Sequence, residues 1–266
     1  MAKSRDRSKN LRVVLLGAAV VLTLIEAFRP LRRPPQEPKL RHTGRNLAIA
    51  GLAAAAVQLV EQPIVMPVAG LVERRRWGII PRLRLPGWLE TTVALLALDY
   101  SLFLWHMLVH RSPGLWRFHA VHHVDLDLDA STAVRFHGGE LISAVPWRVA
   151  QIVLIGVKPP TLGLWQSLTL LSVLFHHSNV RLPQSIEFVL GYLFVTPRMH
   201  GIHHSSRPAE VNANWSSGLS VWDRLHGTLR LDVRQERIQI GVAGYGKEDV
   251  SFEQIVTQPF RPQPQG

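Results

Sequence analysis

The sequence predicts an all-α integral membrane protein with about four to five membrane-embedded helices and a histidine-rich cytosolic cap. Three observations predict this class. Apolar residues make up 47% of the 266 residues and come in blocks. Arg and Lys crowd between the blocks, at 3–12, 29–45 and 74–84, as residues at a lipid headgroup surface do. Most of the thirteen histidines lie at or beyond the ends of the blocks.

The composition excludes several classes of protein. A net charge of +11 is compatible with nucleic acid, acidic lipid or acidic protein as partner. No recognisable nucleic-acid reading module accompanies that charge, so we expect no nucleic-acid binding. The chain has no cysteine, which excludes disulfides, thiolate catalysis, iron–sulfur clusters and zinc ribbons within it. Any metal ion must therefore be held by imidazole or carboxylate groups.

The first half of the chain contains three apolar blocks. Residues 13–25 follow a basic tail and are expected to form an uncleaved, short first span; a signal peptide is the alternative. A basic, proline-rich linker follows at 30–38. The second block, 47–72, is interrupted by Glu61-Gln62-Pro63, where we expect a kink or a re-entrant dip. The third block, 88–108, has about the ~20 residues that a bilayer requires.

The second half contains shorter apolar runs. Residues 149–157 and 161–175 predict a helical hairpin around Lys158-Pro159-Pro160. Residues 186–195 are too few to span a bilayer and are expected to lie at its interface. The chain is polar beyond residue 196, with short β-like pieces at 228–233 and 237–242.

These blocks suggest an organisation into three parts. Residues 1–87 hold N-terminal membrane helices and basic linkers, 88–230 the domain that carries the histidine motifs, and 231–266 a polar C-terminal tail. Three spans before His119 would put the N-terminal tail and the histidines on opposite sides of the membrane. Counts of Lys and Arg do not decide which side is cytosolic.

The histidine spacing indicates metal binding. The pattern H-x-x-H-H occurs twice, at His119/His122/His123 and at His200/His203/His204, and H-x-x-x-H precedes the first. On a helix, positions i, i+3 and i+4 share one face, so we expect each triplet to point its imidazoles at one spot. With His106 and His110, this is enough nitrogen for more than one ion. Neutral imidazole suits iron, zinc, copper and nickel.

Polar residues near the histidines are candidates for supporting roles. Asp99 lies seven residues before His106 on the third span, where a carboxylate is by default a functional candidate. We expect it to accept the second ring N–H of a metal-bound histidine; a structural hydrogen bond to a neighbouring helix is the alternative. His42, before the second block, is expected to be a hydrogen-bonding or headgroup residue.

At these positions the chain resembles the fatty acid hydroxylase/sterol desaturase superfamily of membrane di-iron enzymes, over roughly residues 90–230. The matching segments, in family order, are Asp99-Tyr100, W-H-M-L-V-H, R-F-H-A-V-H-H, R-F-H-G-G-E, H-H-S-N-V-R-L-P, T-P-R-M-H-G-I-H-H-S and N-A-N-W-S-S-G-L-S-V-W-D-R-L-H-G-T. The chain departs from the family pattern at Gly138, at Trp215-Ser216 and at His226.

The resemblance implies a set of metal ligands, position by position. His137 and His177 match two further histidines that the family often carries, and His176 has no counterpart there. Glu140 is expected to orient a histidine or end a helix; a role as a carboxylate ligand is the alternative. Trp222-Asp223-Arg224 is expected to pack the cap over the site. The implied ligands are His106, His110, His119, His122, His123, His137, His177, His200, His203 and His204.

The resemblance also implies two iron ions, O₂ as co-substrate and hydroxylation or desaturation of a lipid, sterol-like or fatty-acyl C–H bond. Electrons are expected from a separate reductase, ferredoxin or cytochrome. The Ala- and Arg-rich composition favours a bacterial cytoplasmic membrane. A histidine-rich metal transporter, a zinc-dependent membrane hydrolase and a non-catalytic scaffold are the alternatives. The absence of H-E-x-x-H leaves a zincin-type protease unsupported.

Overall fold

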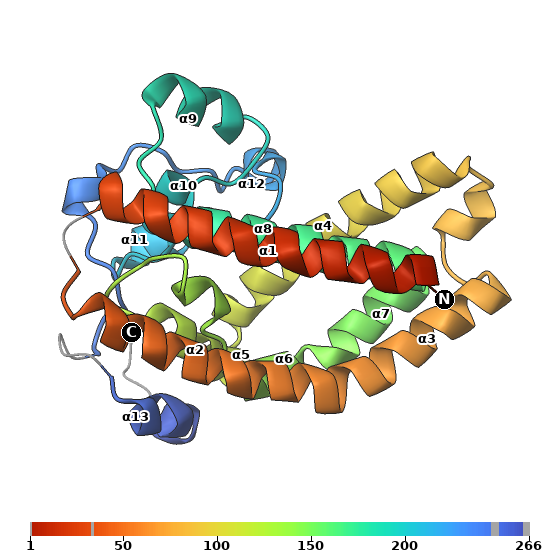
Figure 1. Ribbon diagram of the computed structural model, residues 1–266, viewed down its shortest axis with the longest axis horizontal. Helices are drawn as coiled ribbons and strands as arrows, with labels where there is room; N and C mark the ends of the chain where they lie inside the picture. The colour runs from red at the N-terminus through yellow and green to blue at the C-terminus, as the bar shows by residue number, and fades with distance from the viewer. Residues whose placement is uncertain (1, 33–34, 246–249, 263–266) are drawn as a thin grey trace.

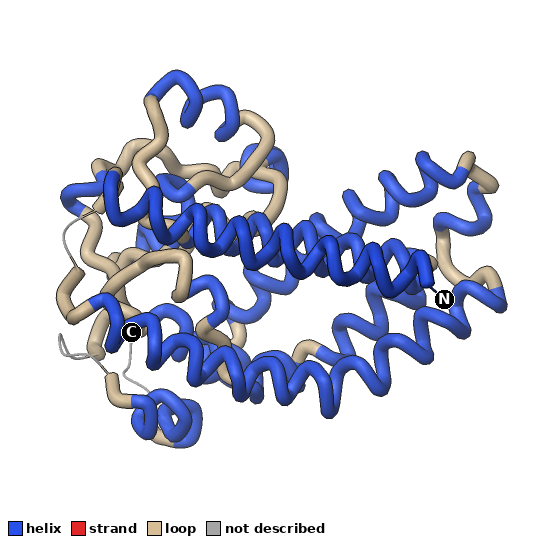
Figure 2. Tube along the Cα trace, in the orientation of Figure 1, coloured by secondary structure: helices blue, strands red, loops and turns tan. Residues whose placement is uncertain are grey.

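The computed structural model describes residues 2–32, 35–245 and 250–262. Within them, every regular element is helical and none is a strand (Figure 2). The prediction of β-like pieces at 228–233 and 237–242 was therefore wrong. Ile240 makes only an isolated bridge with Ser205. The backbone of Thr228 and Arg230 instead bonds to Asn214 in the cap, so no partner strand is available to these residues.

Long helices form an elongated bundle, with the N-terminus at one end and the cap at the other (Figure 1). The start of α1 and the histidines therefore lie at opposite ends of the bundle, and their placement on opposite sides of a membrane stays a prediction. The helices of the bundle are α1 (Ala2–Phe28), α2 (Lys39–Ala56), α3 (Gln62–Arg75), α4 (Gly87–Arg111), α7 (Val145–Ile155) and α8 (Pro159–His177).

Between α2 and α3 the chain stays helical but bends (Figure 1). The π-helical turn η1, Val57–Glu61, occupies the bend, and Pro63 follows it. A proline has no N–H for the carbonyl four residues earlier, which favours a local widening of the helix and a kink. The predicted kink at Glu61-Gln62-Pro63 is thus confirmed in position.

The core of the bundle is apolar and lies between α3, α4, α7 and α8. Its fully buried members include Val65 and Val72 of α3, Leu98 of α4, Ile152 of α7 and Leu162 of α8. In lipid, helices associate through close packing of this kind rather than through the expulsion of water. The predicted hairpin around Lys158-Pro159-Pro160 is confirmed as α7 and α8.

In the described part of the chain, three helical stretches are long and apolar enough to cross a membrane: 39–83, 87–111 and 138–155. The apolar part of α1, Val13–Phe28, is shorter. Together they make an all-helical membrane protein, as the sequence predicts.

The cap is built from short elements and joining segments. They are α5 (Pro113–His123), α6 (Gly138–Ser143), α9 (Gln184–Gly191), α10 (Pro197–His203), α11 (Pro208–Val211), α12 (Val221–His226), α13 (Phe252–Thr257) and the 3-10 turns Thr132–Val134, Gln235–Arg237 and Gln258–Phe260; a further 3-10 turn, Ile80–Leu83, lies at the opposite end of the bundle. Of the residues beyond 230, 231–245 and 250–262 are described and lie at the cap, where Ile255 is buried against Ile49 and Val121.

The basic linker after α1 enters the cap. The Arg32 guanidinium donates to the carbonyls of Pro197 at 2.6 Å and Leu128 at 3.2 Å. At the start of α2, His42 lies between two buried carboxylates, with Nε2 2.9 Å from Asp125 and Nδ1 3.1 Å from Asp129. His42 is therefore a hydrogen-bonding residue. These contacts fix α1 and α2 to the segment that carries the histidines.

Candidate metal centre

Four helices bring the histidines together. The C-terminal end of α4 carries His106 and His110, and Pro113 then ends α4 and starts α5 at its first helical position. α5 carries the first H-x-x-H-H triplet, the end of α8 carries His176 and His177, and α10 carries the second triplet. α10 is capped at its start by Thr196, whose side chain accepts from the Met199 N–H.

The histidines form two adjacent groups. Within each group, one ring nitrogen per residue lies within 4.8 Å of all the others. The groups touch where the rings of His123 and His204 stack with centroids 4.3 Å apart. The five-histidine group consists of His106, His110, His119, His123 and His203. The four-histidine group consists of His122, His177, His200 and His204.

Each triplet is divided between the two groups, which corrects the prediction that a triplet points at one spot. In both triplets the i and i+4 residues stay together, as His119 with His123 and His200 with His204. The residue at i+3 joins the other group, His122 with the second triplet's pair and His203 with the first's. Successive side chains on a helix differ in direction by about 100° around its axis, so the residues at i+3 and i+4 point different ways. Each can therefore reach only one of the two groups.

Oxygen atoms around the groups orient several imidazoles through Nδ1. His106 and His203 donate to the carbonyls of Trp215 at 2.8 Å and Ala213 at 3.0 Å. His119 donates to the Glu140 carboxylate at 2.9 Å. Glu140 therefore orients a histidine, as expected, and does not join either group. Such bonds fix the tautomer in which Nδ1 carries the ring hydrogen, so that the lone pair of Nε2 is free to face a metal ion.

In the four-histidine group, lone pairs face each other. His122 and His177 donate Nδ1–H to the carbonyls of Arg135 at 3.3 Å and Val173 at 2.8 Å. A neutral imidazole has one N–H, so both Nε2 atoms carry lone pairs, and they lie 2.9 Å apart. His200 Nε2 lies 3.0 Å from His177 Nε2 and 3.1 Å from His204 Nε2. The contact between His122 and His177 is repulsive unless a cation lies between the two nitrogens or one ring is protonated.

The five-histidine group also has ring nitrogens that no hydrogen bond satisfies. The Nε2 atoms of His110, His119, His123 and His203 are buried and have no hydrogen-bond partner. Burial, together with neighbouring imidazoles, lowers the pKa of His122 and His203 well below the ordinary value. The rings therefore stay neutral, which is the form that binds a metal ion. The residues present fit two metal ions.

His137, expected as a ligand, lies outside both groups. Its Nδ1 accepts from the Gly139 N–H at 2.9 Å, and its Nε2 donates to the Val256 carbonyl at 3.2 Å. Both nitrogens are thus used by the backbone, and the ring caps the start of α6. Within the R-F-H-G-G-E segment, His137 therefore caps a helix, whereas the Arg135 carbonyl and the Glu140 carboxylate accept from His122 and His119 of the two groups.

Asp99 also differs from its expected role, because it contacts no histidine. Its carboxylate accepts from the Leu219 N–H at 3.0 Å and from Trp222 Nε1 at 2.7 Å. A Cβ at Gly218 would lie 2.1 Å from Asp99 Oδ1, so only glycine fits beside this carboxylate. Asp99 thus fixes the segment that continues from Trp215, whose carbonyl orients His106.

Asp223 supports the same segment from within the cap. It is buried and accepts from the N–H groups of Trp215 at 2.8 Å and Ser216 at 2.9 Å. This agrees with the expected packing role of Trp222-Asp223-Arg224.

Two further features were not assigned from sequence. His176 is buried with its ring 4.1 Å from that of His200, and its Nδ1 has no partner. The fully buried Arg135 donates Nε–H to the Val121 carbonyl, and its own carbonyl accepts from His122. The spacing of residues along the sequence gives no signal for either, because their roles depend on contacts between distant segments.

An apolar cavity of about 670 Å³ lies next to the centre. It is lined mainly by α1, α4 and α8, together with Leu190 and Phe194 at and just after α9. It reaches Ser172, one turn before His176, Phe175, which directly precedes His176, and Gly218 in the segment that Asp99 holds. The volume lies within the roughly 300–1,000 Å³ of ligand pockets.

Comparison with known proteins gives a match over the same part of the chain. A family model described as fatty acid hydroxylase matches residues 91–228. Ornithine lipid hydroxylase OlsE of Rhizobium tropici is 32% identical over 171 residues, which are 64% of this chain and 50% of that protein. Cholesterol 25-hydroxylase of Homo sapiens is 32% identical over 146 residues, 51% of this chain and 49% of that protein.

A third relative is alkylglycerol monooxygenase of Danio rerio, 27% identical over 138 residues, 52% of this chain and 30% of that protein. The chain spans about half the length of the first two of these relatives, and less of the third. No solved structure matches the chain.

Proposed function

The chain belongs to the fatty acid hydroxylase family, and on that premise we propose that it is a membrane di-iron oxygenase that hydroxylates, or desaturates, a C–H bond of a lipid. The observation that carries the proposal is the pair of opposed Nε2 lone pairs on His122 and His177, 2.9 Å apart. The nine ligands of the proposal are the five-histidine and four-histidine groups; His137 is not included.

The nitrogen spacing supports one metal ion within the four-histidine group. Two nitrogens bound to one ion at about 2.1 Å lie about 3.0 Å apart at a right angle and about 3.4 Å apart at the tetrahedral angle. The neighbouring Nε2 atoms of this group lie 2.9, 3.0 and 3.1 Å apart, which is close enough for a single ion. The choice of iron rests on the family match.

When bound, iron supplies the activation of O₂ and the removal of hydrogen from carbon. The protein's own residues do three things. Nδ1–H groups bonded to carbonyls and to Glu140 hold the imidazoles in one tautomer and orientation. Asp99 and Asp223 hold the segment 215–222 against the site. The apolar cavity excludes water and accepts the hydrocarbon part of the substrate.

A lipid substrate is supported by two observations. The cavity is bounded by helices of the bundle, so a chain in the bilayer can enter it from the side. The relatives are named for an ornithine lipid, for cholesterol and for an alkylglycerol, all of which are lipids. We place the cap on the cytosolic side of a bacterial cytoplasmic membrane and the electron donor on a separate reductase, ferredoxin or cytochrome.

The test begins with metal analysis of the detergent-purified protein after iron reconstitution, followed by O₂ consumption and a search for oxidised lipid. We expect about two irons per chain. His122→Ala and His203→Ala each remove a ligand from a different group and should lose iron and activity. His137→Ala is the matched control, since its ring is equally part of a histidine motif, and it should retain both irons. Zinc retained in place of iron would favour a hydrolase or a transporter instead.

A further inference from the structure

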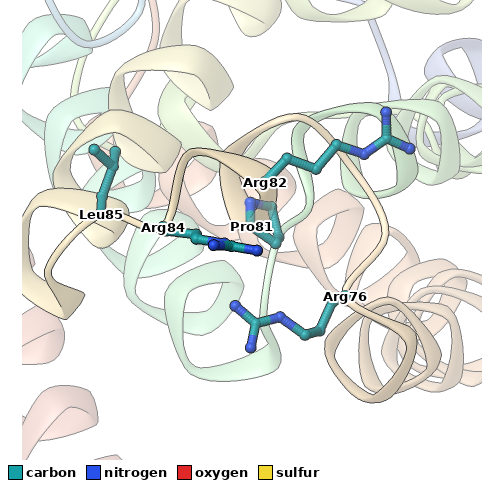
Figure 3. A pocket seen from close by; sticks show the side chains of 5 residues that line it. All are labelled: Arg76, Pro81, Arg82, Arg84 and Leu85. Carbon is teal, nitrogen blue, oxygen red and sulfur yellow. The ribbon is translucent and has the colours of Figure 1, made fainter.

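The end of the bundle opposite the cap carries a second feature, at the turn between α3 and α4. A pocket of about 770 Å³ there is lined by Arg76, Pro81, Arg82, Arg84 and Leu85. Figure 3 shows the side chains of Arg76 and Arg84 pointing toward each other, whereas Arg82 extends away. We infer that this pocket binds the phosphate of an anionic phospholipid headgroup, with Arg76 and Arg84 as the pair that contacts it.

The charge at the pocket is not balanced by the protein. Among the residues whose side chains the structure describes, no carboxylate makes an ion pair with Arg76, Arg82 or Arg84. Glu90, near the start of α4, is paired with Lys158 at 2.7 Å. Two convergent guanidinium groups match the oxygens of a phosphate through paired, charge-assisted hydrogen bonds. An anion from outside the chain can therefore bind these arginines without displacing an ion pair of the protein.

The pocket is held in place by the backbone around it. Arg76 and Arg84 have φ values of 53° and 50°, a left-handed conformation that non-glycine residues adopt at a cost. The Ile79 N–H donates to the Leu154 carbonyl at 2.9 Å, which ties the turn to α7. A Cβ at Gly78 would lie 2.3 Å from Gly156 Cα, so the two backbones are in direct contact. The backbone positions from which the two arginine side chains project are thus fixed before any ligand binds.

The surroundings indicate a lipid rather than a free anion. Trp77 and Trp88 flank the pocket in sequence and are 45% and 71% exposed. Tryptophan is enriched at the level of the headgroups, at both surfaces of a membrane. Leu83 is also exposed at the same turn, next to the arginines. A phospholipid whose phosphate is held by Arg76 and Arg84 would therefore have its acyl chains beside apolar side chains.

The test uses the full-length protein in a neutral detergent and follows its thermal unfolding midpoint. The probes are phosphatidylglycerol, zwitterionic phosphatidylcholine and inorganic phosphate. The variant is Arg76→Gln/Arg84→Gln. The matched control is Arg74→Gln/Arg75→Gln, which removes the same charge from the adjoining end of α3 but alters no residue that lines the pocket. Phospholipid that copurifies with each protein, measured by mass spectrometry, gives a second readout that does not depend on the unfolding midpoint.

We expect phosphatidylglycerol to raise the midpoint of the wild type and of the control, and to act on the pocket variant with an apparent affinity at least about tenfold weaker. The pocket variant should also copurify with less anionic phospholipid. If both double variants lost the response to phosphatidylglycerol equally, the lipid would be attracted diffusely to all the basic residues there, and the proposed site would be overturned. An equal effect of phosphatidylcholine would overturn recognition of the charge. An equal effect of inorganic phosphate would overturn the assignment to a lipid.

Discussion

Replacement of Glu140 tests how the protein holds the five-histidine group. Glu140 is 7% exposed, and one carboxylate oxygen accepts from His119 Nδ1 at 2.9 Å while the other has no hydrogen-bond partner. The His119 bond is therefore its main polar contact. Because a charge-assisted hydrogen bond is roughly twice as strong as a neutral one, Glu140→Gln should weaken the orientation of His119 and Glu140→Ala should abolish it.

The expected magnitude follows from that single bond. Loss of a residue that orients a metal-bound histidine typically lowers metal affinity by about 10–100-fold, equivalent to about 1.4–2.7 kcal/mol. We place the Gln variant at the lower end and the Ala variant at the upper end. Only one of the two groups is affected, so a competing chelator should remove about one metal ion per chain early and the second at the wild-type rate.

The assay is chelator-driven metal release from the purified protein, followed by the metal content per chain. Glu61→Gln is the control, because Glu61 is a buried carboxylate whose partner is Arg148 in the bundle. If Glu140→Ala released both ions with wild-type kinetics, Glu140 would not be what orients His119. If both ions left the Glu140→Ala variant faster than they leave the wild type, the two groups would not be independent sites.

Three further predictions concern the cap, the cavity and acid stability. Arg32→Ala removes buried charge-assisted bonds to Pro197 and Leu128 and should lower unfolding stability by about 3 kcal/mol or more, seen as a lower thermal midpoint; an unchanged midpoint would contradict the anchoring role. Leu168→Trp fills the apolar cavity and should reduce lipid turnover by about tenfold with the metal content unchanged; full turnover would exclude the cavity as the substrate site. Burial acts to raise the pKa of Asp129, but hydrogen bonds from His42 and Lys39 outweigh it and hold the pKa below the ordinary 3.8. A carboxyl group whose pKa is depressed stabilises the fold at pH values above its ordinary pKa, and this contribution is lost as the pH falls through the folded pKa. As the pH is lowered from about 4, the thermal midpoint should therefore fall more steeply in the wild type than in Asp129→Asn.

The helical membrane class could be predicted from sequence because each signal is local. Apolar blocks of bilayer length and basic residues between them act over one helix at a time. Pro63 likewise determines a kink through the hydrogen bond that its own backbone cannot make. The β-like pieces at 228–233 and 237–242 failed as predictions because a strand needs a partner, and the alternation of side chains does not say whether one is near.

The sequence by itself determined that many imidazoles converge, since the spacing of His119/His122/His123 and His200/His203/His204 fixes their faces on short helices. Only the tertiary structure decided how those faces are shared, because four helices meet there and each i+3 histidine turns to the opposite group. Tertiary contacts also decided that His137 binds the backbone and that Asp99 holds the segment 218–222. Spacing along a helix fixes the angle between side chains, whereas the partner of each side chain depends on the segments that fold against it.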